Sequence, residues 1–273
     1  MSGFWVLVMK ELLEAWRTRR LPAIAGVFII VVGIISPLTA RFLPEILKAA
    51  LGSQLSIPIP TPTALDAVVQ VQKNVGQLGA LAAIVLSMGA IATEKERGTA
   101  AFLLTKPASR GAFIAAKLVA LGAVLGVATV MAMVVAWGYT SVLFELQPIV
   151  GWLDLALLAW LSLAVWASIT FLASTVSGSA MAAAGFGVLA LVGLSLIAIV
   201  PQAARFLPAG LDEPARVLAI GVNTHPAAAG TGLGGSATAA FDAAILATAI
   251  VGCIAIVAAS TVLAWLSFRR QEL

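Results

Sequence analysis

The chain has 273 residues, of which 61% are hydrophobic and 10% are charged, with a formal net charge of +4. An ordinary soluble domain has about 25% charged residues, so this chain has too few polar side chains to cover a water-exposed surface. The composition excludes a soluble globule, a collagen and a disulfide scaffold, and it predicts an all-α integral membrane protein. The lone cysteine and lone histidine, Cys253 and His225, offer neither a disulfide framework nor a metal site.

Residues 1–20 are predicted to form an amphipathic helix at the membrane surface. Apolar residues recur at the helical period, and polar residues lie on the opposite face. The apolar set is Trp5, Val8, Met9, Leu12, Leu13 and Trp16, and the polar set is Lys10, Glu11, Glu14, Arg17 and Thr18. We expect Trp5, Leu12, Trp16 and Arg17 to contact the interface, and Leu21-Pro22 to break the helix into an elbow. An ordinary basic flank is the alternative.

Six stretches are long and apolar enough to cross a hydrocarbon core of roughly 30 Å, which takes about 20 residues. They are Leu21–Ala40, Asn74–Thr93, Leu118–Phe144, Leu155–Val176, Ala180–Pro201 and Ala243–Phe268, and none contains Asp, Glu, Lys, Arg or His. Ser177-Gly178-Ser179 supplies the turn chemistry that separates the fourth span from the fifth. Residues 1–273 are therefore predicted to form one transmembrane domain, with external segments at 41–73 and 203–242.

The basic residues predict that both termini are cytoplasmic. An even number of spans puts both termini on one side, and eleven of the 16 basic residues lie on that side. The eleven are Lys10, Arg17, Arg19, Arg20, Lys95, Arg97, Lys106, Arg110, Lys117, Arg269 and Arg270. Cytoplasmic loops carry the excess of Lys and Arg, so we expect a multi-pass protein of the plasma (inner) membrane. This topology accounts for most of the positive charge without a nucleic-acid partner.

The loop 94–117, between the second and third spans, is the most informative stretch. It reads Glu94-Lys95-Glu96-Arg97-Gly98-Thr99, then an apolar run, and then Pro107-Ala108-Ser109-Arg110. Gly98 permits a sharp break, Thr99 can cap a new helix and Pro107 ends that helix within about two turns. The predicted short helix exposes apolar side chains, which usually mark a contact. Alternatively, these side chains only dip into the lipid headgroups.

Glu-x-Glu-x-Gly-Thr, a short apolar helix, and Pro-x-Ser-Arg, placed between spans two and three after an elbow, resemble the permease subunit of ABC type-2 transporters. The resemblance implies the ABCG-like, type V exporter fold. It implies that loop 94–117 carries a coupling helix, held in a cleft of a separate ATP-binding subunit present in two copies. The implied coupling positions are Glu94, Glu96, Gly98, Thr99, Phe102, Leu103, Leu104, Pro107 and Arg110. A second permease chain, in a homodimer, would enclose the pathway with the first.

The sequence lacks both an ATP-binding motif and ionisable residues in the spans, and these two features bear on the energy source for transport. No G-x-x-x-x-G-K-[ST] motif occurs, so ATP and Mg²⁺ are expected on the partner subunit, with no cofactor and no catalytic residue on this chain. Ion-coupled carriers usually place carboxylates or histidines inside the membrane, and the six stretches have none. We therefore expect the permease subunit of an ATP-driven exporter, with amphipathic or lipid-like cargo.

Three alternatives stay open. One is a subunit of the same fold that transmits force to an external maturation or cell-envelope partner. Another is an ion-coupled carrier or channel, and the third is an intramembrane enzyme, for which the spans lack paired carboxylates or a Ser/His set. Small residues at helix-packing spacing, Gly122 with Gly126 and Gly185 with Gly193, are expected to pack helices within the chain, with a dimer seam as the alternative.

Overall fold

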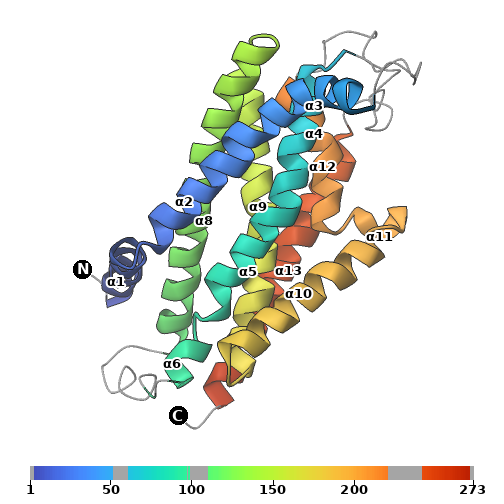
Figure 1. Cartoon of the computed structure of the whole chain (residues 1–273). Helices are drawn as coiled ribbons and strands as arrows, with labels where there is room; N and C mark the ends of the chain where they lie inside the picture. The colour runs from blue at the N-terminus through green and yellow to red at the C-terminus, as the bar shows by residue number, and fades with distance from the viewer. Residues whose placement is uncertain (1–2, 52–60, 97, 99–109, 221–241, 271–273) are drawn as a thin grey trace.

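The computed structural model describes residues 3–51, 61–96, 98, 110–220 and 242–270. These residues form a bundle of long helices (Figure 1). Six helical stretches are long and apolar enough to cross a membrane, as the sequence predicts. They span Arg20–Ile46, Ala64–Glu96, Gly111–Leu143, Ile149–Val176, Ala180–Ile197 and Ala243–Arg270. The chain is thus an all-α membrane protein whose described part contains no strand.

The first two spans are compound helices. The first consists of α2 (Arg20–Phe28), the π-helix η1 (Ile29–Ile35) and α3 (Ser36–Leu51). The second consists of α4 (Ala64–Asn74), the π-helix η2 (Val75–Gly79), α5 (Ala80–Met88) and α6 (Ala92–Glu96). A π-helix widens the backbone turn, and polar side chains meet there. Asn74 Nδ2 donates to Ser36 Oγ at 2.8 Å, which joins the two spans inside the bundle.

The remaining spans are α8 (Arg110–Leu143), α9 (Ile149–Val176), α10 (Ala180–Ile197) and α13 (Ala243–Arg270). Helix α9 is the central one, because it contacts α5, α8, α10, α12 and α13. The predicted turn between the fourth and fifth spans is confirmed. Helix α9 ends at Val176, and the Ser179 side chain caps α10 by accepting from the Ala182 backbone N–H at 3.2 Å.

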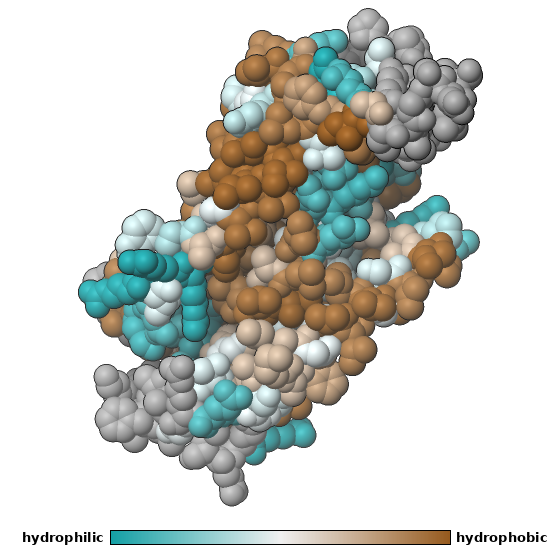
Figure 2. Space-filling model, viewed as in Figure 1, coloured by the Kyte–Doolittle hydropathy of each residue, from teal (hydrophilic) through white to brown (hydrophobic). Residues whose placement is uncertain are grey.

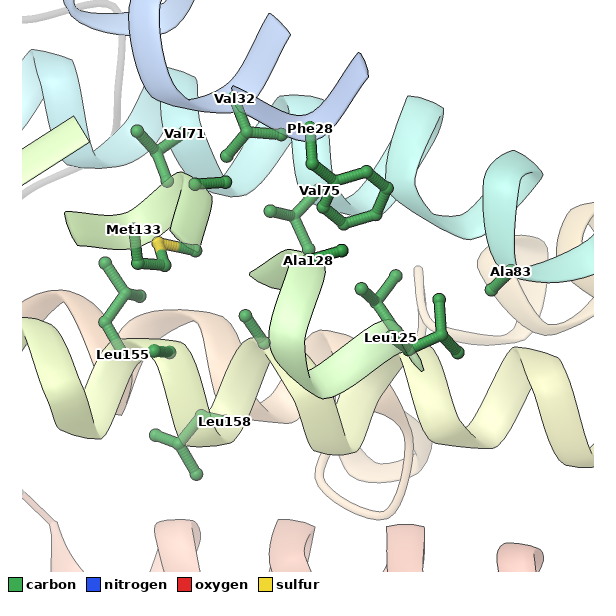
Figure 3. Packing of buried hydrophobic residues seen from close by; sticks show 14 of the residues in the cluster. Phe28, Val32, Val71, Val75, Ala83, Leu125, Ala128, Met133, Leu155 and Leu158 are labelled. Carbon is green, nitrogen blue, oxygen red and sulfur yellow. The ribbon is translucent and has the colours of Figure 1, made fainter. Parts of the chain in front are cut away.

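Figure 3 shows the core where the first and second spans meet α8 and α9. Phe28 and Val32 come from the first span, Val71 and Val75 from the second, and Leu125 and Leu155 from α8 and α9; all are buried. Alanines such as Ala83 and Ala128 are buried in the same cluster. Small residues let helix backbones approach closely. This matters in a membrane because an apolar side chain gains little by contacting another helix in place of a lipid tail, so close packing stabilises the association of helices.

The segment between the fifth and sixth spans folds back onto the bundle. Its helices are α11 (Pro201–Ala204), the 3₁₀ helix η3 (Pro208–Leu211) and α12 (Asp212–Ile220). Helix α12 packs on α9 and α4, so close that a Cβ on Gly151 would lie 1.9 Å from the Leu218 carbonyl oxygen. The described part of the predicted external segment 203–242 is therefore a docked helical element, and residues 221–241 lie outside the described chain.

The other predicted external segment, 41–73, is also largely helical where it is described. Helix α3 continues to Leu51, and α4 begins at Ala64. Asp66 starts α4 by accepting from the Thr63 backbone N–H at 2.8 Å and from Thr63 Oγ1 at 2.9 Å. The helices of the first two spans thus run beyond the apolar stretches, because capping and packing between α3 and α4 continue them.

The prediction that glycines pack helices together within the chain is confirmed for Gly122 and Gly126 and is wrong for Gly185 and Gly193. Trp160 of α9 lies against Gly126, and Trp160 Nε1 donates to the Gly122 carbonyl at 2.8 Å. In contrast, no atom lies within 4 Å of a Cβ built on Gly185 or Gly193. Helix α10 packs through Gly187 instead, where an added Cβ would meet Thr170 of α9 and Ile84 of α5, and Ala183 is buried as well.

The outer surface matches a lipid solvent. Hydrophobic residues cover much of the middle of the face in Figure 2. Hydrophilic residues gather over α1 (Gly3–Arg17), near the bundle ends and in a patch in the region of α4 and α12. Both ends of the chain lie at one end of the bundle. Phe113 at the start of α8 stacks on Phe268 near the end of α13 at 5.9 Å, and Lys117 of α8 pairs with Glu11 of α1. This is the arrangement that an even number of spans requires.

Candidate functional site

The candidate site lies where α1, α6 and the start of α8 meet. Helix α1 has three faces. Val8 is buried and Leu12 is half-buried against the bundle, whereas Trp5 and Trp16 are 55% and 62% exposed. Lys10 and Arg17 lie on a third, polar face. A helix with an exposed apolar stripe beside a charged one suits a position in the membrane interface, which remains a prediction for Trp5, Leu12, Trp16 and Arg17.

The break after α1 differs from the prediction at Leu21-Pro22. It lies at Thr18 and Arg19, where Arg19 has a left-handed backbone with φ of 59° and α2 begins at Arg20. Pro22 falls inside the first turn of α2, where a missing backbone N–H costs nothing because that turn has no intrahelical acceptor for it. Proline therefore marks the start of the second helix and not the break itself.

Lys117 is the centre of the site. Its ammonium nitrogen lies 2.8 Å from Glu94 Oε1 and 3.1 Å from Glu11 Oε2, and its side chain is only 7% exposed. It also lies 5.1 Å from the centre of the Phe113 ring. A buried lysine without carboxylate partners would be strongly destabilising, so these pairs fix α1 and α6 to α8. We call Glu11, Glu94 and Lys117 the charge cluster.

Lys10 extends the charge cluster toward the surface. Its ammonium lies 3.2 Å from Glu11 Oε1 and 3.8 Å from Glu14 Oε2, with 43% of the side chain exposed. Burial lowers the pKa of Lys10, but the negative charges of Glu11, Glu14 and Glu94 outweigh burial, and the net pKa lies above its ordinary value. Lys10 therefore stays cationic.

Residues 94–96 contact two further spans. The Lys95 ammonium donates to the Thr175 carbonyl at the end of α9, and Glu96 Oε1 accepts from the Ala180 backbone N–H at the start of α10, at 3.0 Å. A carboxylate is favoured there because the helix N-terminus is partly positive. Glu94 and Glu96, both predicted coupling residues, thus hold the base of loop 94–117 to α8 and α10. Their contact with an ATPase remains a prediction.

The turn between α5 and α6 is held by α9. Ser174 Oγ accepts from the backbone N–H groups of Ile91 and Ala92 at 3.1 and 3.0 Å. These two donors would otherwise lack partners where the helix is interrupted. The second span is therefore attached to the fourth at the point where it enters the loop.

Gly98 has φ of 67°, so it makes the predicted sharp break. Arg110 is the first residue of α8. The other predicted coupling residues, Thr99, Phe102, Leu103, Leu104 and Pro107, lie outside the described residues. Sequence reasoning placed Lys117 only in the topology count and the loop motif. The missed signal was a lysine inside an apolar helix, which requires an anionic partner.

No group of three or more His, Cys, Asp or Glu that could hold a metal ion occurs in the described part of the chain. His225 lies outside that part, and Cys253 is buried in α13. The described residues of the site form ion pairs and hydrogen bonds that join α1, α6, α8, α9 and α10.

Comparison with known proteins agrees with this architecture. The chain is 27% identical over 221 residues to the uncharacterized transmembrane protein YxlG of Bacillus subtilis (strain 168). That alignment covers 79% of this chain and 84% of the relative. Residues 5–273 match the family described as ABC-2 family transporter protein. The match spans nearly the whole chain, and this six-span membrane protein therefore belongs to the ABC-2 transporter family, as a permease component of membrane transport.

Proposed function

We propose that this chain is the permease subunit of an ATP-driven exporter whose ATPase is a separate polypeptide. Two copies of the chain form the pathway, and two ATP-binding subunits, which carry ATP and Mg²⁺, contact the loops 94–117. Both termini and these loops face the cytoplasm, in the plasma (inner) membrane. The chain itself does no catalysis.

One observation carries this proposal: the base of loop 94–117 is bonded to several helices at once. Glu94 contacts α8 through Lys117, Lys95 contacts α9 at Thr175, and Glu96 contacts α10 at Ala180. Lys117 in turn contacts Glu11 of α1. A displacement of this loop would therefore move the elbow helix and the third, fourth and fifth spans together.

The coupling mechanism follows from this network. Phe102, Leu103 and Leu104 would each contribute roughly 1.5–3 kcal/mol when buried in a partner. Association costs on the order of 4–15 kcal/mol, so one loop holds a partner weakly and two loops in a dimer hold it better. Closure of the ATPase pair would pull on the loop, and the charge cluster would pass that movement to α1 and α8.

The composition of the spans supports an external energy source. The long apolar helices have a high mean hydropathy and at most two charged residues in their most apolar windows. An ion-coupled carrier needs ligands for its ion inside the membrane, usually carboxylates. ATP hydrolysis on a partner removes that need.

Replacement of Leu103 and Leu104 by Asp tests the coupling assignment. We expect the double variant to lose its co-purified ATPase, because two charges would oppose burial of the loop in the partner. The matched control is Leu146→Asp, since Leu146 is 83% exposed between α8 and α9, at the other end of the bundle. Retention of an active ATPase by the double variant contradicts the assignment, as does transport by the purified chain alone under an ion gradient.

A further inference from the structure

A pocket of about 390 Å³ lies between α1, the start of α2, the end of α5 and α8. This volume falls within the roughly 300–1,000 Å³ of small-molecule sites. Its lining combines charged and apolar side chains. The charged ones are Lys10, Glu11, Glu14, Arg20, Glu94 and Lys117, and the apolar ones include Leu86, Leu121 and Val124.

The pocket changes from charged and exposed to apolar and buried. Lys10 and Glu14 have 43% and 49% of their side chains exposed, and Arg20 is also exposed. In contrast, Leu86 and Val124 are 9% and 2% exposed. We call the first group the mouth and the second the floor. A ligand that fits both is amphipathic, with a charged head and a hydrocarbon tail.

The mouth favours an anionic head, because Lys10 and Arg20 supply two positive charges against the single negative charge of Glu14. Both carboxylates of the charge cluster, Glu11 and Glu94, pair with Lys117 inside the pocket. Arg20 makes no side-chain ion pair or hydrogen bond with any residue in the described ranges. Its guanidinium is therefore available for a phosphate, which it can bind through two parallel hydrogen bonds. Lys10, cationic and half-exposed, lines the same mouth, where it already pairs with Glu11 and Glu14.

The position of α1 indicates the source of this ligand. Trp5, Met9, Leu13 and Trp16 form an exposed apolar stripe on the helix whose other faces hold the mouth and the bundle contact. Tryptophan in such a stripe is typical of the depth of lipid headgroups. With α1 at the depth of the headgroups, the mouth would lie at the depth of the leaflet's phosphates. The floor, farther along α5 and α8, would lie at the depth of its acyl chains.

We propose that this pocket binds a glycerophospholipid of the leaflet that contacts α1. The lipid phosphate lies between Arg20 and Lys10, and one acyl chain lies along Leu86, Leu121 and Val124. The bound lipid would contact the elbow helix next to the Glu11–Lys117–Glu94 charge cluster. This inference concerns a site of its own and does not depend on an ATPase partner.

Photo-crosslinking of the full chain in nanodiscs locates the lipid. The probe is phosphatidylglycerol with a diazirine on one acyl chain, present as a minor component in phosphatidylcholine. We expect crosslinks to concentrate in residues 86–94 and 117–124, compared with the exposed face of α10 around Phe186 and Leu189. Labelling that is even over all lipid-facing helices, or absent from the pocket, overturns the proposal.

A charge variant tests the headgroup contact. Native mass spectrometry should show that Arg20→Gln retains about tenfold less phosphatidylglycerol than the unmodified chain, the effect of one lost charged hydrogen-bond partner. Arg270→Gln is the matched control, an exposed arginine at the same end of the bundle. Diacylglycerol with the same chains should bind equally to both variants. Equal phosphatidylglycerol retention by Arg20→Gln, or displacement of the lipid by millimolar inorganic phosphate, contradicts a phospholipid site.

A steric variant tests the floor. Leu121→Trp should fill the apolar end and lower pocket crosslinking, whereas Val127→Trp, at a residue 46% exposed on the same helix, should leave it unchanged. Thermal unfolding reports whether each variant is folded. If Leu121→Trp does not fold, the crosslink map of the unmodified chain and the Arg20→Gln comparison still decide the proposal.

Discussion

The Lys117 ammonium on α8 lies 2.8 Å from a carboxylate oxygen of Glu94 on α6. The two residues stand at opposite ends of the loop 94–117, so their ion pair closes the loop at its base. Glu11 of α1 holds the same ammonium from the other side. The pair therefore fixes the geometry with which the loop leaves the membrane.

Lys117→Met should destabilise the protein by about 3–5 kcal/mol, because it leaves Glu11 and Glu94 without their buried cation. Unfolding by heat or denaturant in a fixed detergent measures the change. Lys10→Met is the control, and we expect about 1 kcal/mol or less, since Lys10 is 43% exposed and solvent screens its ion pairs. Equal stability of the two variants would show that the charge cluster does not stabilise the packing of α1 and α6 on α8.

Gly151→Ala should displace α12 from α9. The added Cβ would lie 1.9 Å from the Leu218 carbonyl oxygen. Because this oxygen belongs to the backbone, the clash can be relieved only if the helix itself moves. We expect a loss of about 1–3 kcal/mol, measured by thermal unfolding. Gly138→Ala in α8 is the matched control, because nothing lies within 4 Å of its Cβ and alanine favours a helix. A neutral Gly151→Ala would mean that α12 is not docked as described.

Gln72→Leu should loosen the same helix through its polar contacts. Gln72 Nε2 donates to the Asp212 carbonyl at 2.7 Å, and Arg216 donates to Gln72 Oε1. The Asp212 carbonyl and the half-buried Arg216 side chain lose these partners, and at about 0.5–1.5 kcal/mol for each hydrogen bond the cost is about 1–3 kcal/mol. Faster hydrogen exchange in residues 212–220 is the measurement. Gln77→Leu, at an exposed site in η2, should leave that exchange unchanged.

Sidedness can be measured with single cysteines. In a Cys253→Ala background, a membrane-impermeant maleimide should label Leu146→Cys in intact cells but not Val176→Cys. Leu146 and Val176 are exposed at opposite ends of the bundle, before and at the end of α9. The excess of basic residues beside the termini predicts that the Val176 end is cytoplasmic. The reverse labelling pattern would invert the proposed topology.

Much of the architecture is readable from local pattern. Each of the six predicted apolar stretches coincides with a long helix, and Ser177–Ser179 and Gly98 make the predicted breaks. The break at Arg19 was misplaced by two residues, because a proline is equally stable in the first turn of the following helix. The packing face of α10 was also misjudged, since Gly185 and Gly187 are two positions apart and periodicity alone does not say which faces α9.

Membrane residence, the count of spans and most breaks between helices follow from composition and the order of residues. The reason is that a bilayer requires about 20 consecutive apolar residues and a fully bonded helical backbone. In contrast, only the tertiary structure determines which partners the buried charged groups have when those partners lie far away in the sequence. Glu11 and Lys117 lie 106 positions apart, and only the packing of α1 against α8 brings their charges together.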